Sequence, residues 1–232
     1  MTSDDQTLTA PAAAAALHDD GWRVLLDGAY STVAVDSPAA AVEVAAAAVR
    51  ACGADAGRLR LDLRADRVEL TLRDPVDGRL HELDVTLAGR IRAAVGELGR
   101  ATAPGGVAGR PVQALEIAVD AIDIPAVAPF WRAVFGYALV SRPIADGEEE
   151  LIVVDPAGQG PTVWFQQMDA PRPQRNRIHF DVVVAEEEAE ARVAAALAAG
   201  GHLVSDARAR AFWVLADAEG NEVCVCTWQD RD

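Results

Sequence analysis

The sequence predicts an α+β fold in two parts: a ββαββα domain followed by a domain of two βαβββ modules. Between residues 58 and 73, leucine and valine alternate with mostly charged residues, which is typical of half-buried antiparallel strands. In residues 112–232 one pattern occurs twice. Glu116 and His179 lie 63 residues apart, and Gly158 and Gly220 lie 62 apart. Offsets that agree within one residue indicate a duplicated unit.

Changes in composition divide the chain into four segments. Residues 1–20 are acidic or alanine-rich without a strong period, so we expect a frayed tail there. Residues 21–98 are expected to form the first domain. Residues 99–111 are rich in glycine, alanine and proline and are expected to be a linker, and residues 112–232 form the repeated half.

Turn and cap residues place the elements of the first domain. Asp27 and Gly28 form a dipeptide typical of hairpins. Ser37 is a suitable N-cap with Pro38 at the first helical position, and Gly53 is expected to end that helix. The expected strands are 22–26, 30–35, 58–64 and 67–73, and the expected helices are 38–52 and 83–98.

Each repeat is expected to contain one strand, one helix and three further strands. The first module is predicted to have strands at 114–120, 138–142, 150–154 and 162–167 and a helix at 126–135. The second is predicted to have strands at 178–184, 202–205, 211–216 and 222–227 and a helix at 186–198.

Charge and composition exclude several classes of function. The net charge of −15 opposes binding to a phosphate backbone, so we expect no nucleic-acid partner. All 21 basic residues are arginine, which excludes a Schiff-base or phosphate-loop lysine. No apolar run approaches the roughly 18 residues of a membrane helix, and we expect a cytoplasmic protein with no membrane partner. Of three cysteines, Cys224 and Cys226 are expected to be buried thiols on one strand face.

The first domain begins with Gly21-Trp22, and Asp84 leads into its last helix. With these residues and this order of elements, residues 20–98 resemble the pterin-4a-carbinolamine dehydratase family. The resemblance implies a histidine pair at the corner that here reads Gly57-Arg58-Leu59-Arg60, and a further histidine near Asp74. Without these acid–base groups we expect a degenerate domain. Asp84 is left as the one pterin-site residue, and His81 is expected at the surface.

Three phrases in the second half carry a second resemblance: residues 130–137, FWRAVFGY; residues 176–181, NRIHFD; and residues 216–222, ADAEGNE. With the two βαβββ modules, they resemble the vicinal oxygen chelate superfamily of glyoxalases, ring-cleaving dioxygenases and bleomycin-resistance proteins. The likeness is to its glyoxalase-like branch, which is common in actinobacteria. The resemblance covers residues 112–229.

The second resemblance implies a divalent metal, bound by the first and last strands of each module. Carried over by position, the ligand places fall on Glu116, on Trp164 or Gln166, on His179 and on Cys224. Imidazole and carboxylate suit zinc, iron, manganese or nickel, so Glu116 and His179 are the expected metal ligands, whereas Cys224 stands where the family has a glutamate. Trp164 and Gln166 share strand parity and are expected to form a pocket wall.

Three functions follow as hypotheses. The first is a binding protein for a small aromatic or apolar molecule, with an incomplete metal site and an inactive dehydratase-like domain. The second is a metal-dependent lyase, isomerase or dioxygenase. The third is a pterin-4a-carbinolamine dehydratase or a pterin-binding module around Asp84, an inference from fold resemblance alone. An acidic homodimer is expected, because both resembled families commonly assemble through their sheets.

Overall fold

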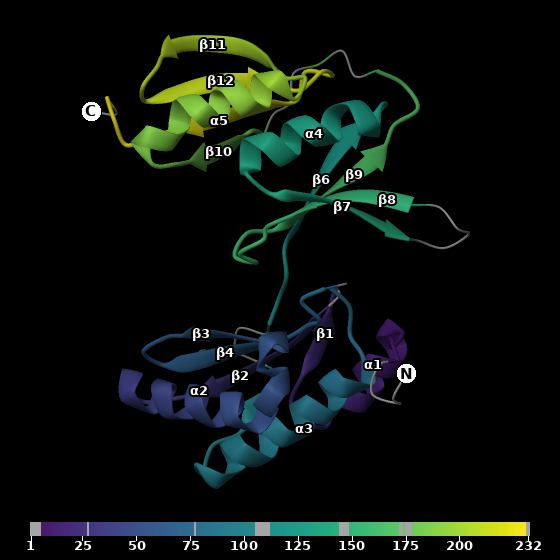
Figure 1. The fold of residues 1–232 in the computed structure, drawn as a ribbon, viewed down its shortest axis with the longest axis vertical. Helices are drawn as coiled ribbons and strands as arrows, with labels where there is room; N and C mark the ends of the chain where they lie inside the picture. The colour runs from purple at the N-terminus through teal and green to yellow at the C-terminus, as the bar shows by residue number, and fades with distance from the viewer. Residues whose placement is uncertain are drawn as a thin grey trace. The chain divides into compact units, whose positions relative to one another are not determined.

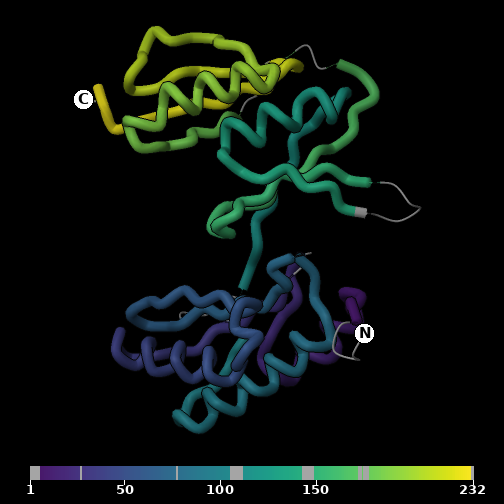
Figure 2. Tube along the Cα trace, in the orientation of Figure 1, coloured from purple at the N-terminus to yellow at the C-terminus, as the bar shows by residue number. Residues whose placement is uncertain are grey.

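The chain forms two compact units, Met1–Ala114 and Leu115–Asp232, in a computed structural model that describes residues 6–26, 28–76, 78–104, 112–143, 149–171, 174 and 178–230 (Figure 1). Both units contain helices and strands, and the described residues form three sheets. The mixed α+β class predicted from the sequence is confirmed. Figure 2 follows the trace from the first unit into the second. Of the predicted linker, residues 105–111 lie outside the described residues.

Unit 1 is an antiparallel sheet whose apolar face is covered by helices. The strands are β1 (Arg23–Leu25), β2 (Gly28–Ala34), β3 (Leu59–Leu63), β4 (Arg67–Leu72) and the short β5 (Thr102–Ala103), in the order β1-β2-β4-β3 with β5 also paired to β2. The helices are α1 (Ala10–Leu17), α2 (Pro38–Cys52) and α3 (Glu82–Glu97), and a 3-10 turn at Gly53–Arg58 follows α2.

The predicted caps of α2 are confirmed. The Ala40 N–H donates to the Ser37 hydroxyl oxygen at 3.2 Å, which satisfies one of the free donors at the helix start. Gly53 has φ +60°, a conformation that only glycine adopts at low cost, and its N–H donates to carbonyl oxygens of the last turn. Val68, Leu70 and Leu72 of β4 point to the core, as the alternation predicts.

The predicted frayed tail is wrong from residue 6 onward. Residues 10–17 form α1, in which Ala13 and Leu17 are fully buried in the core of unit 1. The segment before the helix is also held, because the Leu8 N–H donates to the Leu80 carbonyl at 2.9 Å and the Glu82 N–H donates to the Gln6 carbonyl at 3.1 Å. Burial of one leucine in an otherwise small-residue helix was not visible as a period in the sequence.

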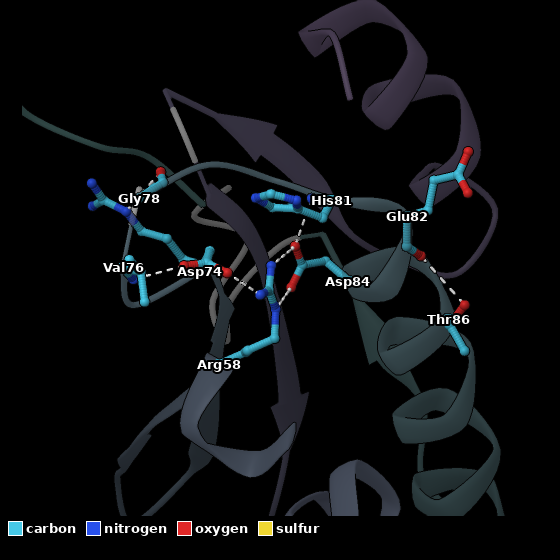
Figure 3. Close-up of polar contacts among 9 residues, drawn as sticks. Arg58, Asp74, Val76, Gly78, His81, Glu82, Asp84 and Thr86 are labelled. Atoms are coloured by element: carbon cyan, nitrogen blue, oxygen red, sulfur yellow. Dashed lines mark hydrogen bonds and ion pairs between the residues drawn. The ribbon is translucent and has the colours of Figure 1, made fainter. Parts of the chain in front are cut away.

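Three charged side chains, which we call the Arg58 cluster, join separate segments of unit 1 (Figure 3). Arg58 ends the 3-10 turn directly before β3, and it donates from Nε and Nη2 to the two carboxylate oxygens of Asp84 at 2.8 and 2.7 Å. Its Nη1 bonds to Asp74, in the loop after β4. Asp84, in the first turn of α3, also accepts the His81 N–H at 2.8 Å. Hydrogen bonding to Asp84 is the main cause that raises the pKa of Arg58 above its usual value.

The burial of His81 next to this cluster differs from the expectation. His81, expected at the surface, is 7% exposed and directly precedes α3. The main-chain bonds of residues 6–8 to residues 80–82 explain this burial, since they lay the N-terminal segment alongside it.

Unit 2 repeats one βαβββ module, as the sequence predicts. Module one contains β6 (Glu116–Ala121), α4 (Ile124–Phe135), β7 (Ala138–Pro143), β8 (Glu149–Val154) and β9 (Thr162–Gln167). Module two contains β10 (Phe180–Val183), α5 (Glu186–Ala198), β11 (His202–Arg208), β12 (Phe212–Ala216) and β13 (Glu222–Cys226). The sheet orders are β6-β9-β8-β7 and β10-β13-β12-β11, with the first and last strands of each module parallel.

The two modules share one core. Helices α4 and α5 pack against each other, and side chains from both sheets join them in one hydrophobic cluster. Trp131 of α4 is 1% exposed, and its indole N–H donates to Asp217 of module two at 3.0 Å. The Glu219 carboxylate accepts the N–H groups of Ile122 and Asp123, just before α4. No helix in the described part of the chain has the length and hydropathy to cross a bilayer.

Replacement of Leu17 by alanine tests whether α1 belongs to the core. We expect Leu17→Ala to lower the free energy of unfolding by about 2–5 kcal/mol, because it leaves a cavity beside the sheet. Leu98→Ala is the control, since that side chain is 40% exposed. Urea unfolding of the full chain measures both. Equal losses in the two variants would show that α1 does not contribute to the core.

Replacement of Asp84 by asparagine tests the Arg58 cluster. Asp84 is fully buried, so Asp84→Asn leaves the Arg58 guanidinium without its main counter-charge, and we expect a loss of about 3–5 kcal/mol. Asp62→Asn breaks the exposed pair of Asp62 with Arg64 and is expected to cost less than about 1 kcal/mol. A loss at Asp84 no larger than that at Asp62, measured by thermal and urea unfolding, would contradict this account.

Candidate functional site

Strand alternation gives each sheet of unit 2 a core face and a second face opposite it. In module two, Phe180, Val182, Val223 and Val225 pack into the core. The intervening residues of β10 and β13 therefore project from the other side, which we call the second face. On this face, the parallel register places Asp181 beside Cys224 and Val183 beside Cys226.

His179, Asp181 and Cys224 come together on the second face of module two. Their ligand atoms all lie within 4.8 Å of one another, and this is the one group of three potential metal ligands among the described residues. The His179 Nε2 lies 3.5 Å from the Asp181 Oδ1. The side chains of His179 and Asp181 are both 53% exposed, whereas Cys224 is buried. We call these three residues the His-Asp-Cys group.

Burial keeps the Cys224 thiol neutral at ordinary pH. Desolvation raises the pKa of Cys224 to about 11, and the negative charge of Asp181 adds to the shift, followed by contributions from Cys226 and Glu222. A thiolate would form here beside an existing carboxylate in a partly dry place, which is unfavourable. A divalent cation at this point would reverse that balance, because it attracts both charges.

The donor atoms of the group fit a borderline or soft divalent ion. Imidazole nitrogen and thiolate sulfur are ordinary ligands of zinc, and a carboxylate completes sets of three in zinc sites. Manganese and magnesium prefer oxygen ligands and are poorly matched by a cysteine. Three protein ligands leave one tetrahedral position for a small molecule or water, which is the arrangement of sites that act on ligands.

Module one lacks the corresponding group. The offset of 63 residues makes Ala118 the counterpart of Asp181, and the strand register pairs Ala118 with Trp164 as it pairs Asp181 with Cys224. Two of the three ligand places in module one are therefore occupied by an alanine and a tryptophan. Only Glu116, the counterpart of His179, has a ligand atom.

The other residues of unit 2 predicted for the site lie in module one. Glu116 begins β6 in the sheet of module one and does not belong to the His-Asp-Cys group. Val163 and Phe165 of β9 pack into the core. Trp164 and Gln166, which alternate with them along the strand, therefore project from the opposite side. Gln166 is exposed, and Trp164 is partly exposed. Their role as a pocket wall stays a prediction.

Asp84 lies in unit 1, fully buried. Both of its carboxylate oxygens accept hydrogen bonds from Arg58, and the same carboxylate caps α3. These contacts give Asp84 a clear structural role, and a pterin site around it stays a prediction.

Asp181 was not predicted as a site residue, although a signal for it was present. It lies two residues after His179, and residues at this spacing share a face of an extended strand. The pairing of Asp181 with Cys224, 43 positions later, depends on the parallel contact between β10 and β13, which the sequence alone did not reveal.

A family model matches a region within unit 2. Residues 116–226 match the family model described as "Glyoxalase-like domain". No curated protein matches the chain. The matched residues lie wholly in unit 2, and the resemblance of residues 20–98 to the dehydratase family stays a prediction.

Solved structures resemble about half of the chain. The hypothetical protein SA1046 from S. aureus is 20% identical, with 50% of this chain and 97% of that chain covered and a TM-score of 0.39. The fosfomycin resistance protein FosX from Listeria monocytogenes is 12% identical, with 49% and 89% covered and a TM-score of 0.39. A glyoxalase-related enzyme from Fulvimarina pelagi is 20% identical, with 50% and 87% covered and a TM-score of 0.38. The family match and the two βαβββ modules identify residues 116–226 as a glyoxalase-like domain.

Proposed function

We propose that unit 2 binds a small molecule on the second face of module two, through a divalent metal held by His179, Asp181 and Cys224. The observation that carries this proposal is the convergence of three different ligand atoms within 4.8 Å. Zinc is the preferred ion, because it accepts nitrogen, oxygen and sulfur ligands together. Iron and nickel are second choices, and manganese is the least suited of the four ions expected from the sequence.

The exposure of the group supports access by a ligand. His179 and Asp181 are about half exposed, so a small molecule can approach the metal from solvent, while Cys224 anchors the ion from the buried side. Bound there, the metal supplies Lewis acidity to an oxygen atom of the ligand. The His179 Nε2 and the Asp181 Oδ1 are 3.5 Å apart, a separation at which both atoms can bind one ion.

An enzyme is the alternative function, a lyase, isomerase or dioxygenase that uses the same metal. The free fourth position of a three-ligand site favours it, since sites of this kind admit a substrate. The binding function requires only the metal and its ligand, whereas the enzyme requires in addition a group that moves a proton. Glu116, Trp164 and Gln166 are the other polar or aromatic candidates for ligand contact, and a homodimer remains part of the proposal.

Metal titration of paired variants tests the site. We expect the purified full chain, freed of metal by a chelator, to bind about one zinc ion, and His179→Ala and Cys224→Ser each to weaken binding by at least about tenfold. Glu116→Gln is the matched control and is expected to bind zinc as the wild type does, because Glu116 lies outside the group. Isothermal titration calorimetry gives the affinities. Loss of zinc binding in Glu116→Gln, with retention in Cys224→Ser, would overturn the assignment.

Proton release gives an independent prediction. The pKa of Cys224 is raised to about 11, so the thiol is protonated at pH 7, and zinc must displace that proton to gain a thiolate ligand. We expect about one proton to be released per zinc at pH 7.5, and the affinity to rise about tenfold per pH unit while the thiol stays protonated. Calorimetry in buffers of different ionisation enthalpy counts the protons. The same count in Cys224→Ser as in the wild type would contradict the role of the thiol.

A further inference from the structure

Helix α2 carries an apolar stripe on the side that faces away from the sheet of unit 1. Its core side, which includes Ala41, Val44 and Ala48, packs against α3 and the sheet. Figure 1 shows α2 and α3 together on one side of this sheet. The outward stripe consists of Ala39, Val42, Ala46 and Val49. Val42 is 58% exposed and Val49 is 43% exposed, both high values for valine in a helix.

The stripe has the spacing of a helix-pairing surface. Its members follow at intervals of three, four and three residues, the repeat that lets two helices pack along their length. At about 100° per residue, the two valines lie on one edge of the stripe, the two alanines lie near its middle, and Glu43 and Arg50 lie on the other edge. Small residues in the middle permit two helix axes to approach to about 8 Å.

The charges indicate which partner fits. We propose that α2 pairs antiparallel with α2 of a second copy of this chain, about a two-fold axis at Ala46. Val42 and Val49 lie at almost equal distances from residue 46 along the helix, so the axis sets Val42 beside Val49 of the other copy. Glu43 and Arg50 are spaced in the same way, so Glu43 lies beside Arg50 of the other copy. The same contacts then occur twice, as a two-fold interface requires. Neither Glu43 nor Arg50 makes an ion pair within the described part of its own chain, so both are available for the partner.

The small area of the α2 stripe leads us to expect a weak dimer. One helix pair buries less than the roughly 800 Å² per partner of a standard interface, so the dimer is expected to dissociate in the micromolar range or above. Electrostatic complementarity then contributes to orientation and partner choice. The dimer uses unit 1 and is independent of the metal proposed for unit 2. It also differs from the sheet-mediated assembly expected from the sequence.

Charge reversal tests both the surface and the orientation. Sedimentation equilibrium of the full chain, over about 1–500 µM, is expected to show a monomer–dimer equilibrium. Glu43→Arg places two arginines together at both ends of the interface, and Arg50→Glu places two glutamates there. Each is expected to raise the dissociation constant by about tenfold or more. The double variant E43R/R50E restores opposite charges and is expected to return the constant to within about threefold of the wild type.

A control variant outside the stripe separates the proposed contact from a general effect of charge. Glu97→Arg changes an exposed position of α3 away from the stripe and is expected to leave the equilibrium unchanged. Circular dichroism melting checks that every variant is folded at the temperature of the sedimentation runs. A wild type that is monomeric throughout, single reversals without effect, or a double variant as weak as the singles would each overturn the proposal.

Discussion

The parallel pairing of the first and last strands of each module is the constraint on which the site depends. β10 and β13 are separated along the chain by a helix and two strands, and their parallel pairing requires the long crossover that those elements supply. The register of this pair then fixes which residues of the two strands lie side by side on each face. Because Phe180, Val182, Val223 and Val225 must reach the core, Asp181 and Cys224 must face the other way, side by side. Core packing and site geometry are two results of one register.

The same backbone carries the His-Asp-Cys group in module two and different residues at the corresponding positions of module one. Both modules have the same sheet order and the same parallel first and last strands. Ala118 and Trp164 replace the carboxylate and thiol of module two, so module one offers a carboxylate at Glu116 and an aromatic surface. Such divergence leaves the fold unchanged, because the substituted positions lie on the second face and contribute little to the core. Among the described residues of unit 2, a group of three potential metal ligands therefore occurs on the sheet of module two alone.

Unit 1 uses buried charge in a different way. Arg58 pairs with both Asp74 and Asp84, and these contacts connect the residue before β3 with the loop after β4 and the first turn of α3. Paired charges in a buried place hold segments in fixed relation but have little capacity left for a ligand. In the His-Asp-Cys group, by contrast, two of three side chains are half exposed. The His-Asp-Cys group therefore presents donor atoms to solvent, whereas the charges of the Arg58 cluster are used within unit 1.

Much of the fold was predictable because local signals agreed with the long-range pattern. The alternation from Leu59 to Leu72, the cap at Ser37 and the repeat offset all correspond to observed elements. α1 was missed because its burial depends on two residues, Ala13 and Leu17, within an alanine run that has no contrast. His179 and Cys224 were predicted singly as site residues, but Asp181 required knowledge of the strand pairing. The resemblance groups Glu116 with His179, whereas in the structure His179 lies beside Asp181, which is two residues later along the chain in β10.

In the proposed site, Cys224 supplies a thiolate to a metal on the second face of module two. Substitution with cobalt(II) tests it most directly, because a thiolate bound to cobalt gives an intense charge-transfer absorption in the near ultraviolet, which nitrogen and oxygen ligands do not give. We predict this absorption in the full chain with one equivalent of cobalt, and its loss in Cys224→Ser with binding through His179 and Asp181 weakened. Cobalt bound tightly without the absorption, or with an absorption unchanged in Cys224→Ser, would contradict the account.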